Sequence, residues 1–507
     1  MARVSRKNHL FRADTLRHAM NAGKEAAVRR FVDDYRLVAV GIGREQWRLF
    51  FDEGRTNKNH LDKTLNGVCG SASVQMARNQ SVEQIDGWVS NRANEFRATV
   101  QASSLPSGTK HMLFVVNRMK AWFGRQDIAM RDTGEVIPLA VRKLARSIMR
   151  HVMARHNRPD LSRVSPRLDS RIAAEIAAPR KAKTADLWVR LRLPKRGTIN
   201  VPLLSHHHHD QRKGELCPVV QLVTGEAGEI GVRLVTDTTD AFAASRADYQ
   251  PRTPFIGIDF GLCTLMATDR GDLIGRGWLA DLKRIDKQLV GIARHRQRIG
   301  EKPRDSARYR GLVTRLRGMI KTRVNAALNR IVAVHAPAEL AVERLDFSHP
   351  DLSRRMNRLL RNCGRKVFND KVVDLEQRFG ITTTEVNPAY TSRECDCGYV
   401  DGRNRQSHAE FACLWCGRRR HADANGAKII TRRRSSGLGL TPGGKGDILK
   451  VLVTRHVERW PDITIRHTGR KGTANDPRLT NPYYAAWADG ARKLQLTQGG
   501  ESCGQMQ

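Results

Sequence analysis

The sequence predicts a multidomain α/β protein in which helical and β-rich parts precede an α/β domain that carries an inserted zinc ribbon. The chain has 507 residues, a length typical of two or three folding units. Hydrophobic residues make up 40 % of it, enough apolar material for several cores. The apolar pattern changes from helical spacing in the first 150 residues to period two at about 185–250. It changes again to alternating strands and helices from 254 onward.

The first 150 residues have the pattern of a helical bundle. Apolar residues recur at helical spacing from Leu16 to Phe31 and again from His111 to Trp122. Residues 136–155 form a third such segment, with many basic side chains. None of these segments carries residue types that indicate catalysis, so we interpret them as an ordinary bundle.

The next part is predicted to be β-rich. Residues Leu187–Pro194, Thr198–Pro202 and Cys217–Val223 alternate with period two, and Gly225–Val235 adds a turn followed by another strand. This pattern predicts a small antiparallel barrel or sheet with basic side chains on one face. The run His206–His209 lies in a polar loop of this part, and we interpret it as a solvated loop rather than a transition-metal site.

From residue 254 onward, strands and helices alternate. A strand at Phe255–Asp259 is followed by a hairpin-like partner at Cys263–Thr268 and by a long basic helical stretch at 281–330. A buried strand at Ala338–Glu343 then precedes a helix at about Met356–Phe379. The chain becomes Gly-rich after about residue 434, and its C-terminal end is predicted to be flexible.

The charge of the chain indicates a polyanionic partner. It holds 89 Lys and Arg against 51 Asp and Glu, a formal net charge of +38, and residues 281–330 alone hold 15 basic against 4 acidic residues. Such an excess favours nucleic acid as the partner. No run of eighteen apolar residues occurs, which excludes a membrane-spanning helix, and the charged start Met1–Lys7 predicts a cytoplasmic protein without a secretory signal.

Four of the nine cysteines cluster within 22 residues, at Cys395, Cys397, Cys413 and Cys416. In a chain predicted to occupy a reducing compartment, this cluster indicates metal ligation rather than disulfides. Four thiolates suit a tetrahedral structural Zn²⁺ ion. The first pair is separated by one residue instead of the usual two, so His408 and His421 are alternative ligands should Cys395 not reach the ion.

Three carboxylates occupy positions that favour a second metal site. Asp259 and Glu343 each end an apolar strand, and Asp423 opens a helix, where an acidic residue is otherwise a common cap. Buried carboxylates are costly unless they face a cation or another partner. If the three converge, they can hold two Mg²⁺ ions roughly 3.5–4 Å apart, with Mn²⁺ as a substitute. In a strongly basic chain, this combination predicts a two-metal nuclease that hydrolyses phosphodiester bonds.

The order of these motifs resembles a known family. Between about 254 and 430 the chain reads Gly257-Ile-Asp-Phe-Gly261, then Val342-Glu-Arg-Leu, Asn387-Pro-Ala-Tyr-Thr-Ser, the four cysteines, and Ala422-Asp-Ala-Asn. This order resembles the RuvC nuclease module of TnpB proteins and of compact type V CRISPR effectors. The chain departs from the family pattern in the short Cys395–Cys397 spacing and in Gly426, where the family usually has Ala.

The resemblance implies a domain layout and a set of site residues. The layout is a β-rich wedge-like domain (1–30 and 160–250), a helical recognition lobe (31–159), an RNase H-like RuvC domain (251–386 and 420–470), a zinc-ribbon target nucleic-acid-binding insertion (387–419) and a C-terminal tail (471–507). By the same resemblance, Asp259, Glu343 and Asp423 are the catalytic Mg²⁺ ligands. Arg405, in the pair Asn404-Arg405, approaches the scissile phosphate.

The function implied by the resemblance is RNA-guided cleavage of DNA in CRISPR defence. A guide RNA pairs with the target strand to form an RNA–DNA heteroduplex, and the protein, favoured as a monomer over a homodimer, reads a short flanking motif in the duplex. One alternative is an RNA-guided binder that silences its target with little cleavage. Others are a transposon-encoded TnpB nuclease and a protein-only transposase or structure-specific nuclease.

Overall fold

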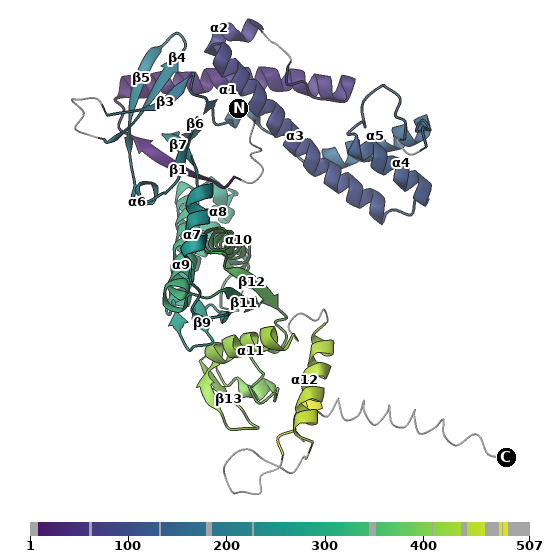
Figure 1. Ribbon diagram of the computed structural model, residues 1–507, viewed down its shortest axis with the longest axis vertical. Helices are drawn as coiled ribbons and strands as arrows, with labels where there is room; N and C mark the ends of the chain where they lie inside the picture. Colours follow the sequence, from purple (N-terminus) through teal and green to yellow (C-terminus); the bar gives the residue numbers. More distant parts are fainter. Residues whose placement is uncertain are drawn as a thin grey trace, which may run out of the picture. The chain divides into compact units, whose positions relative to one another are not determined.

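The computed structural model describes residues 9–59, 63–130, 133–178, 185–225, 228–343, 351–407, 409–437, 444–461, 476–478 and 480–484 (Figure 1). The chain divides into two compact units, Met1–Ala241 and Phe242–Gln507. Both contain helices and a sheet, which confirms the mixed α/β multidomain class. Within the described ranges, no helix has the length and apolar character needed to cross a membrane.

The first unit contains an antiparallel seven-stranded sheet. Its strands, in the order β2-β6-β7-β1-β5-β4-β3, are β1 (Phe11–His18), β2 (Arg167–Leu168), β3 (Ala173–Ile176), β4 (Leu187–Leu193), β5 (Gly197–Leu204), β6 (Glu215–Thr224) and β7 (Ile230–Asp237). Figure 1 shows the purple β1 among the teal strands from much later in the chain. The edge strand β3 also lies against β6, so the sheet curves back on itself like a small barrel. Among the described residues, no hydrogen-bonded ladder joins β2 to β3.

The helices of the first unit are α1 (Ala22–Glu53), α2 (Asn66–Cys69), α3 (Ser71–Ala102), α4 (Ser107–Arg118), α5 (Leu139–Ala154) and the short α6 (His207–Asp210). One apolar cluster packs the sheet against α1 and the start of α3, and a second joins α3, α4 and α5 to the end of α1. The expectation of a helix from Leu16 is wrong, because Leu16 lies in β1. The helix begins at Ala22, where the side chain of Asn21 accepts a hydrogen bond from Lys24 N at 2.9 Å.

The second unit is built on a five-stranded sheet in the order β10-β9-β8-β11-β12. Its strands are β8 (Ile256–Phe260), β9 (Met266–Thr268), β10 (Leu273–Ile274), β11 (Glu339–Glu343) and β12 (Thr382–Val386). The strands β8, β9 and β10 form an antiparallel meander, whereas β11 and β12 run parallel to β8. The predicted strand at Phe255–Asp259 and its hairpin partner are confirmed as β8 and β9.

Helices cover both faces of this sheet. The helix α7 (Thr239–Asp248) begins in the first unit and ends in the second. The other helices of the second unit are α8 (Trp278–Arg298), α9 (Ala307–His335), α10 (Arg354–Phe379), α11 (Ala422–Ser436) and α12 (Lys445–Arg459). Side chains alternate between the faces of a strand, so Leu340 and Val342 of β11 join the core with α8, α9 and α10. Ala341 points the other way and packs against Ile430 of α11. The sheet therefore separates three helices on one face from α11 on the other.

The helix α11 approaches β8 more closely than any side chain at residue 257 would permit. A Cβ atom placed on Gly257 would lie 2.4 Å from the carbonyl oxygen of Ala427 and 2.1 Å from Oγ1 of Thr431. Both atoms belong to α11. Gly257 is therefore the residue that allows this helix to lie directly on the strand.

The C-terminal elements differ from the expected layout. The helix α12, expected within the RuvC domain, packs in the apolar cluster of the four-cysteine region through Ile448, Leu452 and Val453. Most of the expected tail 471–507 lies outside the described residues. In the part that is described, Arg478 and Tyr484 are buried against this same cluster.

We expect Gly257→Ala to destabilise the second unit by about 1–3 kcal/mol, because the new methyl group overlaps the backbone of α11. Thermal or denaturant unfolding measures this change. Gly291→Ala is the matched control. Gly291 is exposed in α8 with no atom within 4 Å of an added Cβ, so alanine there should stabilise by about 0.5–1 kcal/mol. Equal unfolding of the two variants would contradict the close-packing argument.

Candidate active site and metal centre

Asp259 and Glu343 meet at one edge of the second sheet. The strands β8 and β11 run parallel and pair Ile258 with Val342, so the next residue of each strand is a carboxylate. Each carboxylate follows a core residue, and side chains alternate along a strand, so both lie on the α11 face. Asp259 is 8 % exposed, and Glu343 is partly buried. The predicted convergence of these two strand ends is thus present in the structure.

The third carboxylate comes from the first turn of α11. Asp423 is 5 % exposed, and its Oδ2 lies 3.7 Å from the position of a Cβ on Gly261, just beyond Asp259. One turn later, a Cβ on Gly426 would lie only 2.5 Å from Oδ2 of Asp259. Gly426, the departure from the family pattern, therefore leaves the space that the Asp259 carboxylate occupies. The packing of α11 on β8 therefore brings Asp423, one turn before Gly426 on the helix, to the end of the strand that carries Asp259.

The proximity of these groups alters their ionisation. Burial raises the pKa of Asp259 well above its usual range, and the neighbouring Glu343 and Asp423 carboxylates raise it further. Burial also raises the pKa of Glu343, against the opposing effects of a hydrogen bond from Thr391 and the charge of Arg433. Asp259 and Glu343 are close enough to share a hydrogen bond. A cluster of this kind favours a cation, because close carboxylates cannot all ionise without compensating positive charge.

Arg405 reaches this cluster from the four-cysteine region. Its Nη2 donates to Oδ1 of Asp423 at 3.0 Å, and its side chain is about three-quarters buried. The preceding Asn404 is fully buried and holds the loop in place: its Nδ2 donates to Arg393 O and its Oδ1 accepts from Leu414 N, both at 3.0 Å. Asn404 thereby fixes the segment that presents Arg405 to Asp423.

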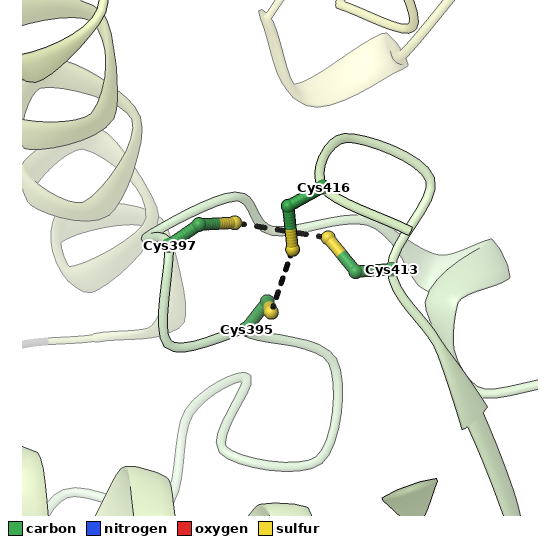
Figure 2. A group of neighbouring side chains, drawn as sticks. All are labelled: Cys395, Cys397, Cys413 and Cys416. Carbon is green, nitrogen blue, oxygen red and sulfur yellow. Dashed lines mark hydrogen bonds between the residues drawn. The ribbon is translucent and has the colours of Figure 1, made fainter. Parts of the chain in front are cut away.

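The four predicted zinc ligands lie together. Figure 2 shows the side chains of Cys395, Cys397, Cys413 and Cys416 pointing toward a common centre. The Sγ atoms of Cys395 and Cys416 are 3.6 Å apart, those of Cys397 and Cys413 are 3.7 Å apart, and all four lie within 4.8 Å of one another. With Zn–S bonds of about 2.3 Å, the edge of a tetrahedral site is about 3.8 Å. The sulfur positions therefore fit a Zn²⁺ ion, and the grouping of the four cysteines is confirmed.

The alternative histidine ligands are not needed for this site. A tight turn closed by Cys395 N donating to Tyr399 O at 3.0 Å brings Cys395 into the cluster despite its short spacing from Cys397. The ring of His421 instead accepts a hydrogen bond from Asp423 N at the start of α11. His408 lies outside the described residues. Within the described ranges, the four cysteines are the group whose ligand atoms all lie within 4.8 Å of one another. Neither His206–His209 nor the three carboxylates Asp259, Glu343 and Asp423 form such a group.

A buried ion-pair network joins the cysteine region to α11, and the sequence analysis missed it. Glu394, which directly precedes the first cysteine, is fully buried and accepts hydrogen bonds from Arg432 and Arg433. The Nδ2 of Asn425 donates to Glu394 O at 2.8 Å. Arg432 also donates to Cys395 O at 3.1 Å. The partners are about 40 residues apart in sequence, so no local pattern identifies them.

Comparisons with known proteins match this region in particular. Residues 368–430 match the family model of the Cas12f1-like TNB domain. The predicted resemblance to compact type V CRISPR effectors is confirmed over this part of the chain. The matched residues include the four cysteines, Arg405 and Asp423, whereas Asp259 and Glu343 lie outside them.

Two curated relatives carry the name CRISPR-associated endodeoxyribonuclease Cas12f1. The protein of Syntrophomonas palmitatica is 39% identical over 62 residues, which is 12% of each chain. That of Sulfoacidibacillus thermotolerans is 35% identical over 75 residues, 15% of this chain and 18% of the relative. The matches thus span less than a fifth of either relative.

Similar solved structures include a Cas12f1–sgRNA–target DNA complex, with a TM-score of 0.36 and 12% identity over 84% of this chain and 99% of that chain. The AacC2c1–sgRNA binary complex gives a TM-score of 0.44 and 8% identity over 83% of this chain and 89% of that chain.

We expect Cys413→Ser to lose bound zinc and to lower the unfolding temperature of the second unit, because a structural zinc ion contributes folding free energy. Metal analysis of the purified protein and thermal unfolding test this. Cys363→Ser, a half-buried cysteine of α10 outside the cluster, is the control and should retain the zinc. Unchanged zinc content in Cys413→Ser would refute the ligand assignment.

Proposed function

We propose that this protein is an RNA-guided, Mg²⁺-dependent DNA endonuclease with a single RuvC-type active site. The observation that carries the proposal is the convergence of Asp259, Glu343 and Asp423 at one edge of the second sheet, with Arg405 paired to Asp423. The strand order, an antiparallel meander followed by two parallel strands, supports assigning the sheet to an RNase H-like domain.

The carboxylate cluster suits hard divalent cations. Mg²⁺ and Mn²⁺ bind to oxygen ligands, and the three side chains offer only carboxylate oxygens. When bound, such ions activate a water nucleophile and stabilise the leaving oxygen of a phosphodiester. The protein fixes the positions of the three carboxylates. Two lie on the paired strands β8 and β11, and the third lies on α11, which packs on β8. In this proposal, Asp259, Glu343 and Asp423 hold the ions.

Arg405 is proposed to stabilise negative charge on the scissile phosphate. Its guanidinium lies beside Asp423, so it is next to the position where a phosphate oxygen would meet the carboxylate-bound ions. A planar guanidinium keeps its charge at all working pH values and matches the geometry of phosphate oxygens. The buried Asn404 holds the Arg405 backbone, which reduces the entropy lost when the side chain binds substrate.

The proposed partners are a guide RNA and a target DNA that together form a heteroduplex. The net charge of +38 supports binding to two phosphate backbones, and an aromatic content of 6 % favours recognition of backbone and shape over stacking of bases. The name of the two curated relatives, CRISPR-associated endodeoxyribonuclease, supports DNA as the strand that is cut. In this proposal the protein acts in CRISPR defence, and guide pairing supplies the sequence specificity.

We expect Asp259→Ala to lower the DNA cleavage rate by more than about 10³-fold while guide-RNA binding is retained, because losing a metal ligand removes several kcal/mol of transition-state stabilisation. RNA that copurifies with the protein is sequenced, and the complex is then incubated with target duplex and Mg²⁺. Asp269→Asn changes a half-buried acid that accepts a hydrogen bond from Thr431 outside the cluster, and it should cleave like the wild type.

Three outcomes would overturn the proposal. Cleavage by Asp259→Ala would show that the site is elsewhere. Full occupancy of the target by the wild type without nicking would identify a binder rather than a nuclease. Cleavage that persists after removal of the RNA would identify a protein-only nuclease.

We expect Arg405→Ala to lower the cleavage rate by about 10²–10³-fold, since a charged donor to the scissile phosphate acts mainly in the transition state. Single-turnover cleavage measures this rate at saturating target. Mn²⁺ binding should not weaken, because the variant removes a positive charge from beside Asp423. Arg419→Ala removes an exposed arginine from the same region, in β14 (Arg419–His421), and should have little effect. Equal rates for the two variants would remove Arg405 from the proposed mechanism.

A further inference from the structure

The loop Asn387–Ser392, between β12 and the first cysteines, contacts the carboxylate cluster directly. Thr391 is 4 % exposed, and its Oγ1 donates to Oε2 of Glu343 at 2.7 Å. The carbonyl oxygen of Pro388 is a second acceptor at the longer distance of 3.1 Å. A hydroxyl has one proton to donate and an ionised carboxylate only accepts, so the shorter contact assigns the Thr391 proton to Glu343.

The backbone of this loop is held in an uncommon conformation one residue earlier. Tyr390 has φ 66°, in the left-handed region that bulky residues rarely adopt. Its carbonyl oxygen accepts hydrogen bonds from Arg393 N at 2.9 Å and Glu394 N at 3.0 Å, which fix the turn. Backbone strain of this kind persists where the surrounding structure imposes it, and it is common at functional sites. Here it aims the following side chain, Thr391, at the carboxylate.

One buried arginine of α11 holds the first residue of this loop and Glu394, which lies two residues after its end. Arg433, 1 % exposed, donates from Nη1 to Asn387 O at 2.6 Å and from Nη2 to Oε2 of Glu394 at 2.7 Å. The same helix carries Asp423 in its first turn. The position of Thr391 is therefore tied to the helix that supplies another member of the cluster.

We propose that Thr391 is a positioning residue that orients the Glu343 carboxylate for divalent cation binding. The last torsion of a glutamate side chain is broad and weakly restricted, so the carboxylate rotates freely unless a hydrogen bond holds it. A donor fixed by the strained turn supplies that restraint. Hydrogen bonds to ligating carboxylates typically contribute 10–100-fold to metal affinity or activity. The inference rests on the proposed function only in assigning Glu343 as a metal ligand.

The test compares Thr391→Val with Thr391→Ser by titrating each full-length protein with Mn²⁺ and following the free ion by electron paramagnetic resonance. Valine keeps the shape without the hydroxyl and should weaken Mn²⁺ binding by about 10-fold or more. Serine keeps the donor and should bind within about twofold of the wild type. Should Thr391→Val fail to fold, Thr391→Ala is the second variant, because alanine removes the hydroxyl without putting a methyl group in its place. Thr391→Ala should also bind Mn²⁺ weakly.

Thr268→Val is the matched control. Thr268 is a fully buried threonine of β9 whose hydroxyl donates to Asp272, a carboxylate outside the cluster. The variant Thr268→Val should lower the unfolding temperature about as much as Thr391→Val does, but its Mn²⁺ titration should match that of the wild type. A merely structural role for Thr391 predicts that both variants lose stability and neither loses affinity.

Two results would overturn the inference. The first is that Thr391→Val binds Mn²⁺ as tightly as the wild type does. The second is that the wild type and Asp259→Ala bind the same amount of Mn²⁺, which would mean that no ion binds at the carboxylate cluster. If the wild type binds Mn²⁺ and Thr391→Val binds it weakly, but the wild type does not cleave DNA, the inference stands and the proposed nuclease function fails.

Discussion

The close packing of α11 on β8 is the constraint on which the rest of the second unit depends. Parallel pairing of β8 with β11 brings Asp259 and Glu343 to one edge without further help. The third carboxylate lies about 80 residues later, and only a helix lying directly on the strand brings it to the same edge. Gly257 permits that contact, because any side chain there would meet the backbone of α11. The glycine at position 257 thus allows Asp423 of α11 to reach the edge where Asp259 and Glu343 lie.

The same helix joins the carboxylates to the cysteine cluster. Glu394 lies beside Cys395 and pairs with Arg433 of α11, and Arg405 extends from the cysteine region back to Asp423. A buried ion pair costs several kcal/mol of desolvation for each charge, so it is retained where it fixes a particular arrangement better than apolar packing does. Folding of the cysteine region, which zinc would stabilise, therefore sets the geometry of the carboxylate cluster as well.

The sequence predicts the parts of this arrangement that depend on local patterns. Strand ends identify Asp259 and Glu343, and ligand spacing identifies the cysteines. The sequence does not reveal interactions between distant segments, such as Glu394 with Arg433 or the burial of Arg478 on Trp415. Composition predicts a flexible tail at 471–507, and no local pattern indicates that Arg478 and Tyr484 are buried against the four-cysteine region. The β1 strand is missed for a related reason: its hydrogen-bonding partners lie between 185 and 226 residues later in the chain.

Three carboxylates at one edge oppose folding through burial and mutual repulsion, and the surrounding residues offset this cost only in part. Arg405 compensates Asp423, and the charge of Arg433 together with the hydroxyl of Thr391 favours ionised Glu343. The charge of Arg405 also favours ionised Asp259, yet burial and the neighbouring Glu343 and Asp423 carboxylates still raise the pKa of Asp259 well above its usual range. A ligand that binds only the folded state stabilises it in proportion to its affinity. A divalent cation at this edge would therefore stabilise the second unit by offsetting the cost of burying Asp259 and Glu343 in their ionised forms.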